Sequence, residues 1–316
     1  MVPEPCLPST QRFPSHMTGI RGSTKLLAVL GDPVGHSLSP VLQNAAIRKL
    51  GLDWRYMALP VSAAALPVAL EGLHALGAVG LNVTIPHKQA VTPLLREVTP
   101  LAQRLGAVNT LLRQPHGWAG DNTDMAGFMA PLQRQEVDLR NTTALVLGGG
   151  GSARAVVAGC NALGCRRILV AGRHPQRLQR FVADARCLAD HPEGVLWSGL
   201  DAVLASVELV VNTTPVGMSP ATTACPLTPA QLDRLRPRAW VYDIIYTPRP
   251  TTLLRQASAR GCATVDGLAM LVGQGAAALR LWSGCHGVDE DAMLTAASAA
   301  LTAPPQSPTE PHDASA

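Results

Sequence analysis

Several features that would assign a chain to a common class of protein are missing from this sequence of 316 residues. No apolar run of about 18 residues is free of charge and proline, so we expect no membrane-spanning helix. The N-terminus carries no apolar segment of the kind that a signal peptide needs. Charged residues make up 15% of the chain, the net charge is +4, and no stretch is dense in Lys or Arg. This composition argues against a nucleic-acid-binding role.

The seven cysteines include no C-x-x-C pair. Cys160 and Cys165 are the nearest two, and both fall on one predicted helix. Because disulfides are rare in reducing compartments, we interpret the cysteines as reduced thiols of a cytoplasmic protein. No metal site is predicted.

The chain is long enough for two domains, and its hydrophobic content of 47% can fill their cores. The segments 1–24 and 303–316 are rich in Pro, Ser and Thr, and we predict that both are disordered. In the first half, apolar runs typical of strands alternate with helical patterns. The expected strands are 26–30, 54–59 and 79–83, and the expected helices are 41–50, 63–76 and about ten residues after Lys88. This alternation predicts a parallel sheet.

Lys88 follows the third of these strands. Pro86 ends the strand and opens a turn, so the lysine is held close to a rigid Thr-Ile-Pro segment. A positioned and partly desolvated lysine can exchange protons near neutral pH. The alternative is an ordinary solvated lysine, which is common after a strand.

Polar clusters occupy other turns of the first half. Ser37 and Ser39 precede a helix, where they could cap it or could form a carboxylate site together with its free N–H groups. Asp121, Asn122 and Asp124 precede another helix, and each could be a turn or cap residue. We expect that interpretation to fit some of the three but not all of them.

A second domain begins near residue 141 with the strand 143–147. Gly148-Gly-Gly-Gly-Ser-Ala153 follows and leads into a helix, which is the context of a dinucleotide-binding turn. An NAD site would carry an acidic residue at the end of the next strand, whereas this chain has Arg173 and Arg177 there. Two guanidinium groups suit a 2′-phosphate, so the sequence favours NADP over NAD.

Two later segments belong to the same argument. A turn with Pro and Gly, 213–218, follows the strand 207–212, where ligands bind in open α/β sheets. A helix starting near residue 268 carries Gln274 on an apolar face. This amide is either a satisfied core group or a ligand contact, and the sequence does not decide between them.

Together these clusters resemble the shikimate dehydrogenase family. The motifs span residues 26 to about 285 in the family's order, and they are Gly31-Asp-Pro-Val-Gly-His-Ser-Leu-Ser-Pro40, Asn82-Val-Thr-Ile-Pro-His-Lys88, Gly106-Ala-Val-Asn-Thr110, Gly120-Asp-Asn-Thr-Asp124, the glycine turn, Asn212-Thr-Thr-Pro-Val-Gly-Met218, Tyr242-Asp-Ile-Ile-Tyr246 and Asp266-Gly-Leu-Ala-Met-Leu-Val-Gly-Gln274. Motifs in a fixed order are far more specific than any one of them.

The resemblance implies reversible reduction of 3-dehydroshikimate to shikimate with NADPH, in aromatic amino-acid biosynthesis. It implies an α/β fold with a substrate-binding catalytic domain at 25–130 and a Rossmann-type NADP-binding domain at 131–266. The final helices, 267–302, would return to the first domain. A small-molecule substrate is the expected partner, and a homodimer is left open.

The resemblance also implies roles for individual residues. Lys88 and Asp124 would form the catalytic pair. The residues that would contact the substrate are Ser37, Ser39, Thr84, Lys88, Asn109, Asp124, Tyr246 and Gln274, with the two serines on its carboxylate. The residues that would hold NADP are Gly148, Gly149, Gly150, Gly151 and Ser152 at the pyrophosphate, Arg173 and Arg177 at the 2′-phosphate, and Ile244 and Gly267 beside the nicotinamide.

The chemistry leaves two roles open for Lys88. Asp124 would raise its pKa and burial would lower it, so it is either the acid/base or mainly an electrostatic stabiliser. The family's Asn-Arg-Thr after the second strand of the NADP domain is Gly172-Arg-His here, which changes two flanking polar groups. The competing functions are a quinate/shikimate dehydrogenase using NAD and a non-catalytic NADP-binding regulator.

Overall fold

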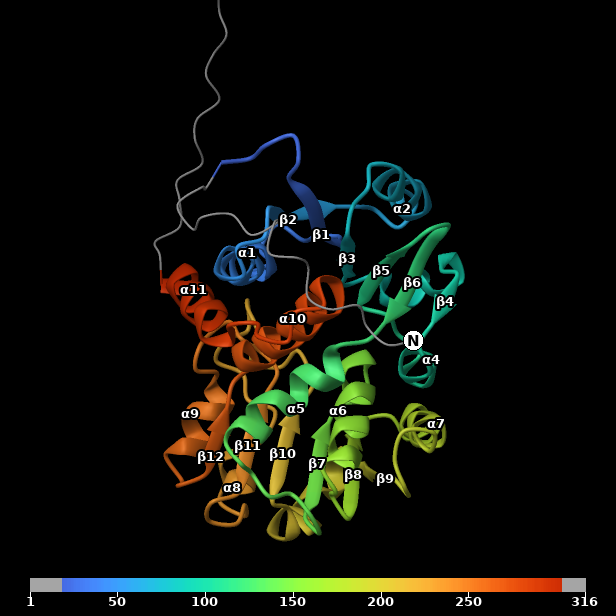
Figure 1. The fold of residues 1–316 in the computed structure, drawn as a ribbon. Helices are drawn as coiled ribbons and strands as arrows, with labels where there is room; N and C mark the ends of the chain where they lie inside the picture. Colours follow the sequence, from blue (N-terminus) through green and yellow to red (C-terminus); the bar gives the residue numbers. More distant parts are fainter. Residues whose placement is uncertain (1–18, 303–316) are drawn as a thin grey trace, which may run out of the picture.

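The computed structural model describes residues 19–302, which form two six-stranded sheets that lie one above the other in Figure 1. The predicted disordered segments 1–24 and 303–316 lie outside these residues, except for 19–24. The first sheet has the order β2-β1-β3-β5-β6-β4, with β1 Lys25–Gly31, β2 Trp54–Pro60, β3 Gly80–Val83, β4 Glu97–Val98, β5 Thr110–Gln114 and β6 Gly117–Asp121. Its helices are α1 Ser39–Lys49, α2 Leu66–Ala75, α3 His87–Ala90 and α4 Pro100–Leu105, with a 3-10 turn, Thr92–Leu94.

The second sheet has the order β12-β11-β10-β7-β8-β9, and each neighbouring pair is parallel. Its strands are β7 Thr143–Leu147, β8 Arg167–Gly172, β9 Glu193–Leu196, β10 Leu209–Asn212, β11 Trp240–Asp243 and β12 Ala263–Val265. Its helices are α6 Gly151–Ala162, α7 Pro175–Ala185, α8 Pro229–Leu232 and α9 Thr252–Ser258, with 3-10 turns at Trp197–Ala202 and Leu204–Ser206. This strand order is that of a dinucleotide-binding sheet, in which the order reverses between β7 and β10.

The apolar run of β7 is fully buried because both faces of this sheet are covered. Ala144 and Val146 pack into the core on one face, and Leu145 and Leu147 pack into the core on the other. Successive side chains of a strand point to opposite faces, so a continuous apolar run is what a strand covered on both sides requires. The fold class predicted from the sequence is therefore confirmed.

The parallel pairing predicted from the first three strands is confirmed, because β1 is parallel to both β2 and β3. The sheet as a whole is mixed, since β5 runs antiparallel to both β3 and β6. Only the two residues 115–116 join β5 to β6, and such a short connection permits only an antiparallel pair. One expectation was wrong, because the ten-residue helix expected after Lys88 is the four-residue α3 and a 3-10 turn that contains Pro93.

Helices α5 Asp124–Arg134, α10 Gly267–Ser283 and α11 Glu290–Thr302 lie between the sheets or against α1. α10 packs against α5 and α1, and α11 packs against α1, so the last described helix lies beside the first (Figure 1). The Trp282 indole also donates to the Leu111 carbonyl of β5, at 3.0 Å. The domain boundaries at 130 and 266 stay a prediction.

Helices α5 and α10 meet at two glycines. A Cβ on Gly127 would lie 2.6 Å from the Gln274 Cβ and 2.8 Å from the Met270 carbonyl oxygen. A Cβ on Gly273 would lie 2.9 Å from the Ala130 Cβ. The two backbones are therefore in contact, and Gln274 is placed by that contact.

Gly127→Ala should lower the free energy of unfolding by about 1–3 kcal/mol, because the added methyl group forces α5 and α10 apart. The matched control is Gly72→Ala in α2, since nothing lies within 4 Å of a Cβ at that exposed position. There the loss of glycine flexibility should raise stability by roughly 0.5–1 kcal/mol. Urea unfolding of both variants measures the two changes, and equal effects at the two positions would refute the close contact.

Candidate active site

A cavity of about 320 Å³ lies between the sheets, where β1 and β3 end and α10 begins. Every residue that the sequence predicted for substrate contact lines it, namely Ser37, Ser39, Thr84, Lys88, Asn109, Asp124, Tyr246 and Gln274. We call this the substrate-side cavity. Ser152, Ile244 and Gly267, which were predicted for the cofactor, line the same cavity.

Lys88 is placed by the turn after β3. The His87 N–H donates to the Thr84 carbonyl at 2.7 Å, and the buried His87 ring contacts the Val61 carbonyl at 2.7 Å. The Lys88 carbonyl in turn accepts from the Val108 N–H at 2.8 Å. The backbone on both sides of Lys88 is thus fixed, and its side chain extends into the cavity.

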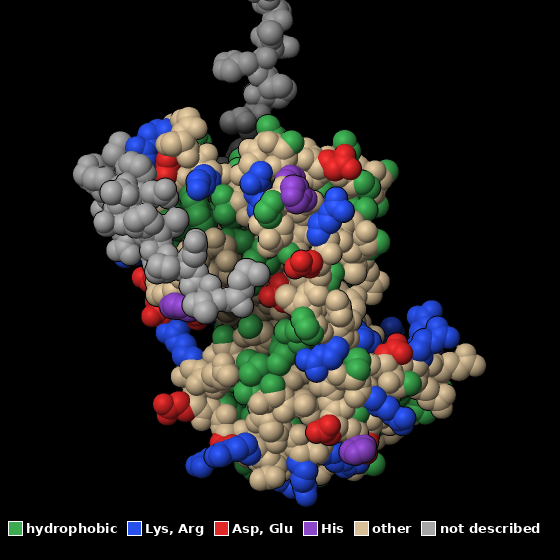
Figure 2. All heavy atoms as spheres, turned by 45° about the vertical axis from the view of Figure 1, so that its right-hand side comes forward, with side chains coloured by type: hydrophobic (Ala, Val, Ile, Leu, Met, Phe, Trp, Pro, Cys, Tyr) green, Lys and Arg blue, Asp and Glu red, His purple; other side chains and the backbone are tan. Residues whose placement is uncertain are grey.

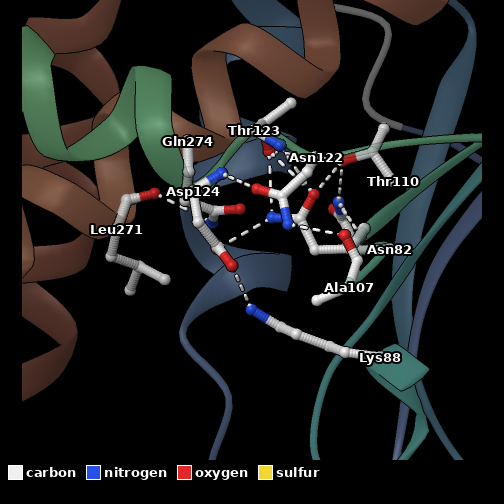
Figure 3. A network of polar contacts seen from close by, with 10 residues as sticks. Asn82, Lys88, Ala107, Thr110, Asn122, Thr123, Asp124, Leu271 and Gln274 are labelled. Carbon is white, nitrogen blue, oxygen red and sulfur yellow. Dashed lines mark hydrogen bonds and ion pairs between the residues drawn. The ribbon is translucent and has the colours of Figure 1, made fainter. Parts of the chain in front are cut away.

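The Lys88 ammonium lies 2.6 Å from Oδ2 of Asp124. Asp124 is the first residue of α5, and its other oxygen, Oδ1, accepts from the Asn109 side-chain amide at 2.8 Å. The two side chains are 28% and 12% exposed. The carboxylate therefore has one oxygen for the lysine and one for the amide, which fixes its rotation (Figure 3).

The neighbours of Asp124 have local roles. Oδ1 of Asn122 accepts from the Asp124 N–H at 2.9 Å, and the Asn122 amide donates to the Ala107 carbonyl at 2.9 Å. Asp121 accepts from the Thr99 hydroxyl at 2.6 Å and from the Asn122 N–H at 2.7 Å. Of the three polar residues in this turn, only Asp124 lines the cavity.

Asn109 belongs to a buried polar network that the sequence did not reveal. The Asn82 amide donates to the Asn109 carbonyl at 3.0 Å and to the Thr110 hydroxyl at 3.1 Å, and the Tyr56 hydroxyl donates to Oδ1 of Asn82 at 2.7 Å. Thr123 completes the network through the Asn109 side chain. Asn82 also lines the cavity and was missed as a site residue. Its place in the motif before Thr84 was the available signal.

Three further residues that line the cavity are Ser37, Gln274 and Tyr246. Oγ of Ser37 accepts from the Ser39 N–H at 3.2 Å, at the start of α1. The Gln274 amide donates to the Leu271 carbonyl at 3.1 Å. Burial raises the pKa of Tyr246 above 10, so its phenol is a neutral hydrogen-bonding group at physiological pH.

A second cavity, of about 490 Å³, lies at the carboxyl ends of β7, β8 and β10, and we call it the cofactor-side cavity. Gly148, Gly149, Gly150, Arg173 and Arg177 line it, as predicted, and Gly151 begins α6 and lines neither cavity. The residues that the sequence argument missed here include His174, Phe181 and Trp197, whereas Thr213 belongs to the turn 213–218 that it named.

The glycine turn fits a dinucleotide. Gly148 has φ +102, and a Cβ there would lie 2.9 Å from Cγ2 of Thr214, whereas nothing lies within 4 Å of a Cβ on Gly150. The space above Gly150 is therefore open for a pyrophosphate at the N-terminus of α6. Within residues 19–302, no group of three His, Cys, Asp or Glu side chains could hold a metal ion.

The comparisons with known proteins agree with this geometry. Residues 29–111 match the family model "Shikimate dehydrogenase substrate binding domain", and 267–297 match "Shikimate 5'-dehydrogenase C-terminal domain". The chain is 53% identical over 268 residues to a shikimate dehydrogenase (NADP(+)) of Thermosynechococcus vestitus. The aligned region covers 85% of this chain and 93% of the Thermosynechococcus enzyme. The chain belongs to the shikimate dehydrogenase family.

Solved structures agree with the assignment to this family. The shikimate 5-dehydrogenase of Thermus thermophilus, solved with NADP(H) and shikimate, matches with a TM-score of 0.79 at 36% identity and covers 88% of this chain and all of that one. The quinate dehydrogenase of Corynebacterium glutamicum, solved with NAD, matches with a TM-score of 0.80 at 31% identity, covering 87% and 99%. The fold is thus shared by enzymes with different substrates and cofactors.

Among the described helices, none has the length and hydropathy needed to cross a membrane. On the face drawn in Figure 2, Lys and Arg side chains are interspersed with Asp and Glu rather than gathered in one patch.

Tyr56→Phe should lower the free energy of unfolding by about 1–3 kcal/mol, because Oδ1 of the buried Asn82 loses its donor. Tyr242→Phe is the matched control, since the Tyr242 hydroxyl is buried and has no hydrogen-bond partner among residues 19–302. Removing that hydroxyl should leave stability unchanged or raise it. Urea unfolding compares the two, and a smaller loss for Tyr56→Phe than for Tyr242→Phe would contradict the network.

Proposed function

We propose that the chain catalyses the reversible NADPH-dependent reduction of 3-dehydroshikimate to shikimate. The observation that carries this proposal is the Lys88–Asp124 pair, held in a cavity whose wall also includes residues of the dinucleotide-binding half. The relatives bear the name of this activity, and the predicted NADP preference agrees with that name.

The substrate-side cavity offers groups that match the substrate. Shikimate carries one carboxylate and three hydroxyls on a six-membered ring, and polar side chains line this cavity from both sheets. Ser37, Ser39 and the neutral phenol of Tyr246 are proposed to bind the carboxylate. Thr84, Asn109 and Gln274 are proposed to bind hydroxyls.

Lys88 is proposed to exchange a proton with the substrate oxygen at the reacting carbon. The cofactor supplies the hydride, and the ketone oxygen then gains negative charge that must be neutralised. The Lys88 ammonium donates a proton to that oxygen, or a hydrogen bond that stabilises the charge, and Asp124 holds the ammonium in place. In the reverse direction Lys88 takes up the proton of the hydroxyl.

Arg173 and Arg177 are proposed to select NADP. Both line the cofactor-side cavity, and the strand β8 that precedes them ends in Gly172 rather than in an acid. Two guanidinium groups can neutralise a 2′-phosphate, whereas a ribose hydroxyl gains little from them. The quinate dehydrogenase with NAD has the same fold, so the cofactor must be tested directly.

The location in the cell and the oligomeric state are proposals as well. A cytoplasmic location is supported by six cysteines within residues 19–302 that are free thiols. The mass of the protein in solution tests whether it is a homodimer.

Replacing Lys88 by Met should lower kcat for shikimate oxidation at least about 100-fold, because the proton-transfer group is lost. The NADP+ dissociation constant should stay within about twofold, because Lys88 does not line the cofactor-side cavity. NADPH absorbance measures the rate, with quinate and NAD+ assayed in parallel.

An unchanged kcat in the variant would refute the proposed role of Lys88. A preference of the wild type for quinate or NAD+ would favour a quinate/shikimate dehydrogenase that uses NAD. NADP+ binding without any turnover in wild type would favour a non-catalytic regulator.

Arg173→Ala should weaken NADP+ binding about 10- to 100-fold, because a hydrogen bond between charged groups contributes about 1.5–3 kcal/mol. NAD+ binding should not change. The control is Arg180→Ala, which removes the same charge from α7 at an exposed position outside the cavity. Calorimetry of wild type and both variants gives the six dissociation constants. An equal loss of affinity for NADP+ and NAD+ in Arg173→Ala would place Arg173 elsewhere than at the 2′-phosphate.

A further inference from the structure

Asn212 and Asp243 form a buried pair that lines neither cavity. They end the neighbouring strands β10 and β11 in direct register, and both are 0% exposed. The Asn212 amide donates to Oδ1 of Asp243 at 3.0 Å. The pair therefore sits under the carboxyl edge of the sheet, between the two turns that leave these strands.

Each member of the pair holds one of those turns. Oδ1 of Asp243 accepts from the Ile245 N–H at 3.2 Å, in the segment 244–246, of which Ile244 and Tyr246 line the substrate-side cavity. Oδ1 of Asn212 accepts from the Thr214 N–H at 3.0 Å and from the Thr214 hydroxyl at 2.7 Å. The segment 213–216 lines the cofactor-side cavity. We call 244–246 the substrate-side turn and 213–216 the cofactor-side turn.

The surroundings of Asp243 suit an ionised carboxylate. A third donor, the Thr251 hydroxyl, lies 2.8 Å from Oδ2, so the carboxyl group faces Asn212, Ile245 and Thr251 as donors. No ion pair within residues 19–302 includes Asp243. A buried charge without a cation is costly, and burial accordingly raises the pKa of Asp243 to about 6 although the donors oppose the rise.

We propose that Asp243 is a positioning residue whose carboxylate holds the cofactor-side turn and the substrate-side turn in one fixed arrangement, so that the binding of both ligands depends on it. This inference rests on the proposed function, because it takes the two cavities as the sites of NADP and shikimate. A neutral carboxyl group can donate its proton from Oδ2 to the Thr251 hydroxyl, which leaves Oδ1 as an uncharged acceptor. The hydrogen bonds that Oδ1 accepts from Asn212 and Ile245 are then weaker, because they no longer involve a charged group, and the turns loosen.

Asp243→Asn imitates the neutral carboxyl, because its amide keeps one acceptor oxygen and gains hydrogens. Near pH 8 the KM values of the variant for shikimate and NADP+ should both be about tenfold above wild type, with kcat reduced less than about threefold. Toward pH 5 the wild-type carboxylate becomes protonated, so its KM values should rise to those of the variant. The KM ratio should therefore fall toward one as the pH is lowered through the pKa.

Dividing the KM of the variant by the KM of wild type removes the effects of groups that titrate in both proteins. Cys225 lines the cofactor-side cavity, and burial together with the Asp243 charge raises the pKa of its thiol. Lys88, Asp124 and Tyr246 are also common to both proteins, so their effects on KM largely cancel. Leu145→Ala is the control for simple destabilisation, since it empties part of the same sheet's core without touching either turn. It should lower kcat by reducing the folded fraction and leave both KM values unchanged.

The outcomes separate this inference from the proposed function. Equal KM values in variant and wild type at every pH, or a ratio that stays constant from pH 8 to pH 5, would overturn the role of Asp243 while leaving the activity intact. Absence of NADP-dependent shikimate oxidation in wild type would overturn the proposed function instead. In that case the ratio of NADP+ dissociation constants from calorimetry, followed over the same pH range, still decides the inference.

Discussion

The ion pair between Lys88 and Asp124 is the interaction on which the rest of the site depends. The lysine lies in α3, the short helix after β3, and the aspartate opens α5, the helix that leads to the second sheet (Figure 1). Removing two charges from water costs free energy, and their attraction offsets that cost only when the geometry is good and the remaining oxygen is satisfied. The Asn109 amide satisfies it. The buried network of Asn82, Thr110 and Thr123 therefore serves to keep one carboxylate in one rotamer.

Helix α5 links this ion pair to the end of the chain. Asp124 and Gly127 lie three residues apart and so share a face of the helix. The same face that carries the carboxylate receives α10, and the glycine lets the backbone of α10 come close. Figure 3 shows Gln274 next to Asp124, and the close packing of α10 on Gly127 places it there. The sequence left Gln274 between a core amide and a ligand contact, and its place on the cavity wall favours the second interpretation.

What the sequence predicted well was local. The glycine turn, the Thr-Ile-Pro turn before Lys88 and the polar turn before Asp124 each combine a strand or helix pattern with residues that permit only a few backbone shapes. What it missed depends on contacts between distant residues. Tyr56 and Asn82 are far apart in the chain, and only the register of β2, β1 and β3 brings them together. The helix expected after Lys88 was too long, because α3 ends at Ala90 and a 3-10 turn with Pro93 follows. The antiparallel direction of β5 depends on how strands are joined, which the alternation of strands and helices does not specify.

Backbone contacts shape part of the wall of the substrate-side cavity. Ser152 and Ile244 come from the predicted dinucleotide-binding domain and Gly267 begins α10, and all three line this cavity. At Gly267 any side chain would collide with the Ile244 carbonyl, so α10 begins directly against the turn that Asp243 holds. A contact between backbones cannot relax by a change of rotamer. The position of the cavity wall at Ile244 and Gly267 is therefore set by the backbone rather than by side-chain rotamers.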